Sequence, residues 1–187
     1  MKKNEAHNPW TKLSSEIKYE NPWIKVIEDK VKNPAGNDGI YGVVHFKTHA
    51  IAVIPLDENN NTWIVGQYRY PQESYEWEIV EGGCKEGTSP LETAKRELIE
   101  EAGLSAENFE LILEMQLSNS CTDEVSYTYI ARGITYVGEQ PEEDELFIIK
   151  KLPFAEVYEM AMRGEIRDGL SVASILKTNV LLQEGKI

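Results

Sequence analysis

The sequence contains few cysteines, no excess of basic residues and no long hydrophobic run. Only Cys84 and Cys121 are present, too few for a dense disulfide framework and without the spacing of a metal finger. No segment reaches the length of a membrane span, and no apolar stretch follows the charged N-terminal residues as in a signal peptide. We therefore expect a protein of a reducing compartment, the cytoplasm by default, that is neither secreted nor inserted in a membrane.

Acidic residues outnumber basic ones by 32 to 19, which gives a formal net charge of −13. Such a chain gains nothing from neutralising phosphates, so nucleic-acid polymers and anionic membranes are disfavoured as partners. An anionic substrate would have to be bound through cations. With 187 residues, of which 41% are hydrophobic, the chain is long enough for one domain with a proper core and a small appended element.

Strand-like runs fill the first half of the chain, and helical patterns dominate its end. Polar, turn-forming residues at 33–39 and 57–62 separate strand-like runs, and the second of these turns is expected to close a hairpin. After a helical segment near 90–102, further strand-like runs lead to helical patterns at 154–165 and 171–182. This order predicts a mixed α/β domain in which helices cover a sheet.

The segment "SPLETAKRELIEEAG" carries the signals of one well-defined helix. Ser89 is a good N-cap, with Pro90 at the first helical position and Glu92 placed to complete a capping box. Gly103 supplies the C-terminal stop. The apolar residues of the helix form one narrow stripe that should pack on the sheet, namely Leu91, Ala94, Leu98 and Ala102.

Three glutamates, Glu97, Glu100 and Glu101, gather beside this stripe. Like charges one turn apart cost roughly 0.2–0.5 kcal/mol, and carboxylates in the last turns oppose the helix dipole by about 0.3–1 kcal/mol. Arg96 can offset part of this cost through Glu92 and Glu100. A divalent cation would offset the rest, and carboxylate oxygens suit Mg²⁺ or Mn²⁺. The alternative is a solvated acidic helix face.

A glycine-rich stretch, "EGGCKEG", separates the preceding strand-like run from this helix. Gly82 and Gly83 allow the backbone to turn sharply and approach a ligand closely, so a bare carbonyl can join a metal site. Stretch and helix together resemble the Nudix box of pyrophosphate hydrolases, in which Gly and Glu precede Arg-Glu-apolar-any-Glu-Glu-any-Gly-apolar at fixed spacing. The sequence follows this box from Gly82 to Leu104 except at Thr88, where the family has Glu. The part that begins at Arg96 is intact.

Further segments resemble the Nudix subgroup that hydrolyses ADP-ribose and other nucleoside diphosphate sugars. They are "VGQYRYP", "SNSCTDE", "EEDELF" and "GEIRDGLSVASIL", and the likeness runs from about Trp23 to Leu176. The resemblance implies a Nudix-type α/β/α sandwich with a mixed sheet over residues 49–187. It also implies a small N-terminal β subdomain over residues 1–48 that makes the protein a homodimer, with this subdomain swapped between the two copies.

The resemblance implies the metal ligands as well. Glu97, Glu100 and Glu101, with the backbone carbonyl of Glu81, would hold Mg²⁺ ions, for which Mn²⁺ can substitute. Divalent cations neutralise the oxygens of a pyrophosphate and activate the attacking water, so Glu100 counts among the catalytic residues too.

The general base of the subgroup comes from an acidic loop after the box, here "QPEEDELF". Glu143 and Glu145 are its candidates, and Glu143 is slightly preferred. The alternative for this loop is a solvated acidic turn.

Three residues elsewhere are expected to bind substrate. Arg69 occupies a family position that contacts phosphate, for which a guanidinium is well suited. Trp23 would stack on the base, and Glu124 would bind a sugar hydroxyl or a metal. The structural alternatives are a surface salt bridge for Arg69, packing for Trp23 and an ordinary loop acid for Glu124.

The substrate within the subgroup stays open. Strict ADP-ribose hydrolases carry a proline beyond the box where this chain has Asn119 and Ser120, so ADP-ribose and GDP-mannose are both candidates. Two other classes of protein compete with the enzyme. A non-catalytic sensor that binds nucleotide sugars would fit Thr88 but not the intact carboxylates, and a purely structural acidic protein would not explain the capped helix after a double glycine.

Overall fold

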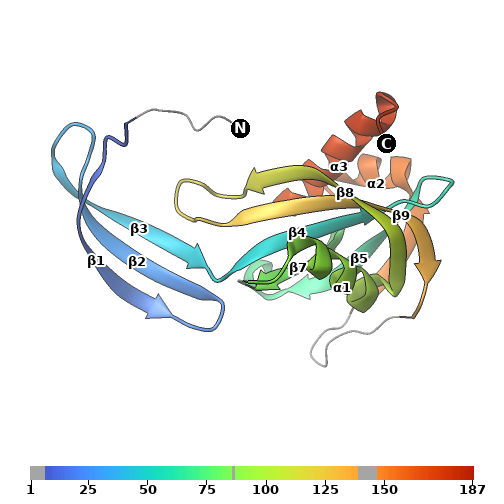
Figure 1. Ribbon diagram of the computed structural model, residues 1–187, viewed down its shortest axis with the longest axis horizontal. Helices are drawn as coiled ribbons and strands as arrows, with labels where there is room; N and C mark the ends of the chain where they lie inside the picture. Colours follow the sequence, from blue (N-terminus) through green and yellow to red (C-terminus); the bar gives the residue numbers. More distant parts are fainter. Residues whose placement is uncertain (1–6, 86, 139–146) are drawn as a thin grey trace. The chain divides into compact units, whose positions relative to one another are not determined.

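A computed structural model of the chain describes residues 7–85, 87–138 and 147–187. Within them the chain forms two compact units (Figure 1). The first unit comprises the described residues up to Lys47 and the segment Ser118–Glu124, and the second comprises Thr48–Leu117 and Val125–Ile187. A short segment from the second half of the chain is therefore part of the first unit.

Three antiparallel strands form the first unit in the order β1-β2-β3. They are β1 (Thr11–Glu20), β2 (Ile24–Lys32) and β3 (Asp38–Phe46). The turn predicted at 33–39 links β2 to β3 as a hairpin. Ser118–Glu124 joins β3 through its backbone, since the N–H of Val44 donates to the carbonyl of Cys121 at 2.8 Å. This segment therefore extends the small sheet beyond β3.

Two sheets form the second unit, with the orders β10-β5-β6 and β7-β4-β9-β8. Their strands are β4 (Thr48–Pro55), β5 (Asn61–Arg69), β6 (Ser74–Glu78), β7 (Val80–Lys85), β8 (Leu104–Gln116), β9 (Val125–Tyr136) and β10 (Ile148–Pro153), and a 3-10 turn, Tyr70–Gln72, follows β5. The larger sheet is mixed, because β4 runs parallel to β9 and antiparallel to β7.

The hairpin predicted around residues 57–62 is wrong. A turn does connect β4 to β5, but the two strands belong to different sheets. Strand β4 already pairs with β7 along one edge and with β9 along the other, which leaves no edge for β5. The pairing partners of β4 come from residues distant in sequence, which a local turn pattern cannot reveal.

Strand β4 separates two hydrophobic cores. Ala52 faces one core and Ile51 the other, because successive side chains of a strand point to opposite faces. Helix α1 (Pro90–Ala102) covers the core of Ile51, whereas α2 (Phe154–Met162) and α3 (Gly169–Gln183) cover that of Ala52 (Figure 1). The predicted mixed α/β sandwich and its helices are confirmed.

The described part of the chain contains no helix with the length and apolar character needed to cross a membrane.

Candidate active site

Helix α1 begins and ends where its sequence predicts. Pro90 is its first residue, and Gly103 after its end adopts a left-handed conformation with φ 66°, which suits glycine. The capping box is not formed, because Ser89 makes no side-chain hydrogen bond to the helix. Glu92 instead accepts a hydrogen bond of 2.8 Å from Lys95, so a neighbouring lysine holds it on the helix surface.

The predicted apolar stripe is the buried face of α1. Ala94, Leu98 and Ala102 are buried there against the sheet. Glu97 and Glu101 are buried with them and expose only 7% and 5% of their surface. A solvated acidic face therefore does not describe these two carboxylates, whose burial costs free energy unless partners compensate.

Glu97 packs against the backbone of β7 at Gly82. A Cβ atom added to Gly82 would lie 1.9 Å from the carboxyl carbon of Glu97, far inside van der Waals contact. Gly82 and Gly83 both lie within β7 and pair with β4, so the sharp turn expected of them is wrong. Because Gly82 has no side chain, the carboxylate of Glu97 can approach strand β7 closely.

Glu101 contacts the residue just before Gly82. The backbone N–H of Glu81 donates to Oε2 of Glu101 at 2.9 Å. The two buried carboxylates of α1 thus lie against adjacent residues of β7. The carbonyl of Glu81, the predicted backbone ligand, belongs to the same short segment.

Arg96 offsets part of the negative charge of this cluster. Its guanidinium forms ion pairs with Glu97 and Glu100. The expected contact with Glu92 is not made, because Glu92 pairs with Lys95. One arginine therefore holds two of the three clustered glutamates.

The residues of the cluster fit a hard divalent cation. Glu97, Glu100 and Glu101 offer carboxylate oxygens, the donors that Mg²⁺ and Mn²⁺ prefer, and Gly82 leaves room for one of them beside the strand. Among the residues that the structure describes, no group of three or more His, Cys, Asp or Glu side chains is already arranged to hold a metal ion. Arg96 pairs with two of these carboxylates, so a cation has to compete with its guanidinium.

Thr88, the departure from the Nudix box, lies in the turn before α1. Its N–H donates to the carbonyl of Lys85 at 3.0 Å, and its own carbonyl accepts from the thiol of Cys84 at 3.4 Å. These contacts are local to the turn. The departure therefore leaves the carboxylates of α1 in place.

Arg69 is bound by a carboxylate of the neighbouring strand. Its Nε donates to Oε1 of Glu78 at 2.8 Å, and its Nη2 pairs with Oε2 of the same residue. The pKa of Arg69 is raised, first by this bond and then by the charge of Glu78, with further contributions from Glu81 and Glu101. Because the Glu78 carboxylate is buried, the pair is more firmly fixed than an ordinary surface salt bridge, and it lies within electrostatic reach of the cluster.

A second guanidinium is held in the same way. Arg167, just before α3, donates from Nε to Oε2 of Glu76 at 3.1 Å. Glu76 and Glu78 are both buried and, two residues apart on β6, share one face of the strand. Two buried carboxylates therefore fix two arginines, of which the sequence predicted only Arg69.

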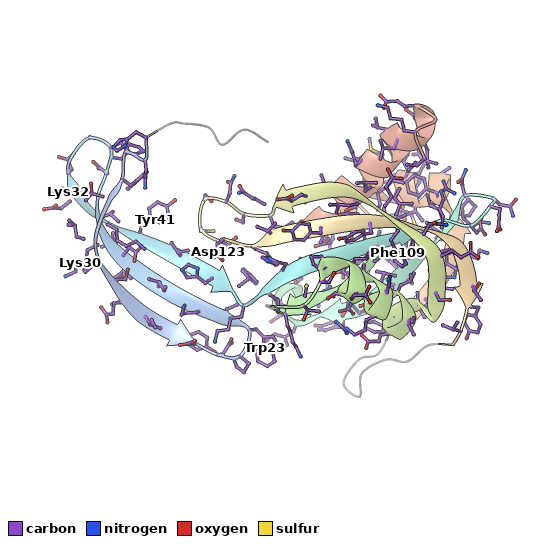
Figure 2. All side chains as sticks on the ribbon, in the orientation of Figure 1. Trp23, Lys30, Lys32, Tyr41, Phe109 and Asp123 are labelled. Atoms are coloured by element: carbon purple, nitrogen blue, oxygen red, sulfur yellow. The ribbon has the colours of Figure 1, made fainter. Side chains whose placement is uncertain are left out.

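Trp23 and Glu124 belong to the first unit. Trp23 lies in the turn between β1 and β2, and its side chain is 69% exposed (Figure 2). Its backbone is fixed, since its N–H donates to Oδ1 of Asn21 at 2.8 Å and its carbonyl accepts from the N–H of Lys47 at 2.9 Å. Core packing therefore does not explain this tryptophan. Glu124 is half-buried at the end of Ser118–Glu124.

Glu143 and Glu145, the candidates for the general base, lie outside the described residues. Their assignment stays a prediction from the resemblance.

The carboxylates and arginines of this site lie within residues 46–171, the segment that matches the NUDIX domain. The chain belongs to the Nudix family. Residues 10–44 of this Nudix protein match the nucleoside diphosphate sugar hydrolase N-terminal domain.

Relatives and a solved structure agree with this assignment. The chain is 30% identical over 180 residues to an ADP-ribose pyrophosphatase of Mycobacterium tuberculosis, covering 94% of this chain and 86% of the relative. It is 27% identical over 140 residues to a GDP-mannose pyrophosphatase of Yersinia enterocolitica, covering 69% and 68%. The crystal structure of an ADP compounds hydrolase matches the fold with a TM-score of 0.85 over 98% of this chain and 100% of that one, at 18% identity. The predicted Nudix pyrophosphohydrolase of the nucleoside diphosphate sugar class is confirmed.

The Nudix box leaves out side chains that α3 brings to β7. Ser171 is buried and donates from its hydroxyl to Oε1 of Glu81 at 2.7 Å. Asp168 caps α3 by accepting from the N–H of Ser171 at 2.7 Å. Burial and the nearby Asp168 carboxylate raise the pKa of Glu81 well above its usual value. The available sequence signal was "RDGLS", an Asp three residues before a Ser, which is typical of a helix start.

Proposed function

We propose that the protein hydrolyses the pyrophosphate bond of ADP-ribose, GDP-mannose or a similar nucleoside diphosphate sugar. Water adds to one phosphorus, the bridging oxygen leaves with the other phosphate, and the products are a nucleoside monophosphate and a sugar phosphate. ADP-ribose and GDP-mannose are the leading substrates because relatives named for them align with most of this chain.

One observation carries this proposal. Helix α1 places two buried carboxylates, Glu97 and Glu101, against adjacent residues of β7, and Gly82 lacks the side chain that would block Glu97. With Glu100 and the carbonyl of Glu81, these groups would hold Mg²⁺, for which Mn²⁺ can substitute. The cation supplies charge neutralisation at the phosphate oxygens and activation of the attacking water.

The chain itself supplies cationic groups for an anionic substrate despite its acidic composition. Arg69 and Arg167 are each held by a buried carboxylate of β6. Each side chain is therefore already ordered and loses less conformational entropy when it binds phosphate. Arg69 is the proposed pyrophosphate contact, since its electrostatic environment includes Glu81 and Glu101. A fixed guanidinium near the metal ligands would orient the substrate rather than merely attract it.

Three further roles complete the proposal. Trp23 stacks on the base, which its exposed side chain permits. Glu124 binds a sugar hydroxyl or a metal. Glu143 or Glu145 accepts a proton from the attacking water.

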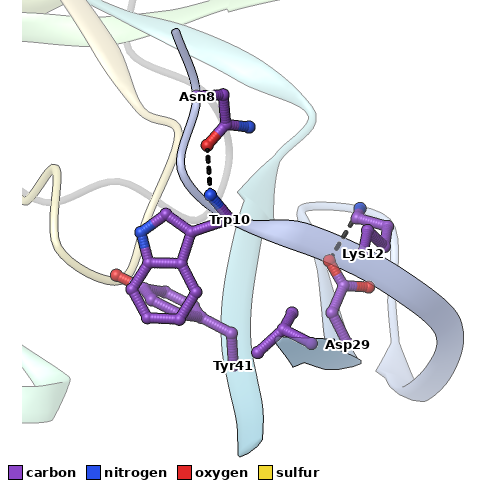
Figure 3. A pocket seen from close by; sticks show the side chains of 6 residues that line it. Asn8, Trp10, Lys12, Asp29 and Tyr41 are labelled. Carbon is purple, nitrogen blue, oxygen red and sulfur yellow. Dashed lines mark hydrogen bonds and ion pairs between the residues drawn. The ribbon is translucent and has the colours of Figure 1, made fainter. Parts of the chain in front are cut away.

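The protein is proposed to be a homodimer formed through residues near 10–48. In the described part of the first unit, Val31 is the only buried hydrophobic residue. Trp10 and Tyr41 meet edge to face at 5.3 Å between ring centres and line a hollow of about 270 Å³ on this unit (Figure 3). A three-stranded sheet with so little buried apolar surface is marginally stable by itself and gains from a second copy.

The cytoplasm stays the proposed location. Cys84 and Cys121 are both free thiols, as is usual in a reducing compartment.

The deciding experiment is a screen for turnover. Purified protein with Mg²⁺ is incubated with ADP-ribose, GDP-mannose, other nucleotide sugars and dinucleoside polyphosphates, and a phosphatase releases phosphate from the products for detection. Hydrolysis of nucleotide sugars in the presence of Mg²⁺, and its loss with a chelator, is the expected result. Tight binding of nucleotide sugars without phosphate release would instead identify a sensor.

A further inference from the structure

Ser171 connects α3 to the junction between two sheets. Ile79 is the one residue between β6 and β7, where the chain passes from the smaller sheet to the larger. Its N–H donates to Oγ of Ser171 at 3.1 Å. Both residues are buried, so water cannot satisfy the N–H of Ile79. The hydroxyl of Ser171 accepts this hydrogen bond in place of a neighbouring strand.

The same hydroxyl also reaches Glu81, the residue just before the Nudix box. A serine hydroxyl has one proton and two lone pairs, so it can accept from Ile79 and donate to Oε1 of Glu81 at 2.7 Å at the same time. The backbone of Glu81 is bound in turn, because its N–H donates to Glu101. A continuous set of hydrogen bonds therefore runs from α3 through Glu81 to a buried carboxylate of α1.

The start of α3 fixes the position of Ser171. The backbone N–H of Ser171 donates to Oδ2 of Asp168, the N-cap of the helix, at 2.7 Å. A side chain near a capped helix end and buried on all sides has little freedom to move. Ser171 thus has the rigidity that a supporting residue needs.

We propose that Ser171 is a positioning residue for the metal site: it holds the backbone of Glu81 in place, and through it the carboxylate of Glu101, for cation binding. The inference rests on the proposed function, because it assigns the Glu81 carbonyl and Glu101 to the cation. Ser171 acts through Glu81 and contacts neither the substrate nor the reacting atoms. Partners of this kind, one step removed from the metal, orient the ligands that they touch.

The first test measures metal binding without turnover. Mn²⁺ is titrated into the full-length protein without substrate, and the free ion is followed by its electron paramagnetic resonance signal. Ser171→Ala should weaken Mn²⁺ affinity roughly ten- to hundredfold. The Mg²⁺ concentration for half-maximal turnover should rise by a similar factor.

Ser174→Ala is the matched control. Ser174 is equally buried on the same helix, but its Oγ lies 2.8 Å from Oγ1 of Thr128, so the variant loses a comparable hydrogen bond elsewhere. It should bind Mn²⁺ as the unmodified protein does. Unchanged affinity in Ser171→Ala, or an equal loss in Ser174→Ala, would overturn the proposal.

A second pair of variants keeps the proposal testable if Ser171→Ala does not fold. Glu81→Gln retains an oxygen that can accept from Ser171, whereas Glu81→Ala removes it. Glu81→Ala should lose more Mn²⁺ affinity than Glu81→Gln, and equal losses in both would assign the effect to charge and refute the role of Ser171. Glu101→Gln separates the two proposals. If Glu101→Gln binds Mn²⁺ normally, the proposed metal site is wrong; if it loses Mn²⁺ while Ser171→Ala and Glu81→Ala do not, only the role of Ser171 fails.

Discussion

The first and second units are both rich in strands, but they bury very different amounts of apolar surface. In the second unit, each face of β4 packs into its own hydrophobic core, and helices close both cores. In the first unit, Ile17 and Ile40 are more than half exposed, and the sheet is held mainly by its backbone ladder and by polar contacts such as Lys12 to Asp29 at 2.6 Å.

This difference separates two tasks. The metal-binding role proposed for the buried glutamates of α1 needs rigid neighbours, and they have them because β4 is packed on both faces. The first unit has side chains left to bury, which suits association with another surface. We therefore expect changes in the second unit to affect chemistry, and changes in the first, apart from the proposed substrate contacts Trp23 and Glu124, to affect assembly.

The largest expected effect concerns the acidic loop between β9 and β10. Glu143→Gln should lower turnover by roughly 10² to 10⁴ through loss of the general base, with nucleotide-sugar affinity nearly unchanged. Steady-state kinetics and equilibrium binding check this. Glu145→Gln is the control, and full turnover of the Glu143 variant beside an inactive Glu145 variant would transfer the role. If both retain full activity, the loop does not supply the base.

Glu101→Gln should lower turnover by about a hundredfold or more, because loss of a direct ligand should cost at least as much as loss of an outer partner. The fold should persist, since the volume is unchanged and the amide oxygen can still accept from Glu81. Glu92→Gln, on the exposed side of the same helix, should have no such effect. Unchanged turnover of Glu101→Gln at saturating Mg²⁺ would show that this carboxylate is not a ligand.

Gly82→Ala should weaken Mg²⁺ activation roughly ten- to hundredfold, because its Cβ would displace the carboxylate of Glu97. Gly83→Ala is the matched variant: a Cβ there would meet Thr48 at 3.7 Å, an ordinary contact. Titration of activity with Mg²⁺ compares the two. Similar behaviour of both variants would contradict the close approach at Gly82.

Ile17→Glu tests assembly through the first unit. Ile17, Ile27 and Val43 lie opposite one another across the three strands, and a charge in this apolar row should raise the dimer dissociation constant at least about tenfold. Sedimentation at micromolar concentration measures it, with Ser14→Glu, an exposed polar position on the same strand, as the control. A monomeric unmodified protein would count against the dimer itself.

The smallest expected effect is on stability and its dependence on pH. Burial raises the pKa of Asp57, but hydrogen bonds from Lys151 and Asn61 outweigh it and hold the pKa well below its usual value. Asp57→Asn should lower the free energy of unfolding at pH 7 by about 1 kcal/mol. Because the folded pKa is depressed, this stabilisation is complete above the unfolded pKa of about 3.9 and fades as pH falls below it.

Urea unfolding at pH 7 and pH 3 checks the Asp57 prediction. The difference in free energy of unfolding between Asp57→Asn and the unmodified protein should be smaller at pH 3. Asp29→Asn in the first unit is the comparison. The pKa of Asp29 is also lowered, first by Lys12, but its unit has almost no core, so its loss should change the main unfolding transition less. A larger effect at Asp29 would mean that the two units unfold as one.

Much of the site could be predicted from local sequence. The bounds of α1, its buried stripe and the clustering of Glu97, Glu100 and Glu101 follow from signals within a few residues of one another. One local prediction was wrong, since Ser89 makes no side-chain hydrogen bond and Glu92 pairs with Lys95 instead of completing a capping box. The other mistakes arose where a partner lay outside that range. The β4–β5 hairpin and the glycine turn were wrong because strand partners, distant in sequence, decided the backbone there.

The sequence by itself determined that a helix beginning at Pro90 and stopped by Gly103 presents three glutamates after a glycine pair, because the glycine stop and the i, i+4 spacing act within a single turn. Only the tertiary structure decided that Gly82 receives the carboxylate of Glu97, that Glu78 fixes Arg69 and that Ser171 supports Glu81. These contacts join residues from separate elements, and burial of the two cores brings the elements together. A hydrogen bond inside a packed protein depends on which surfaces exclude water, and that is settled by the whole fold.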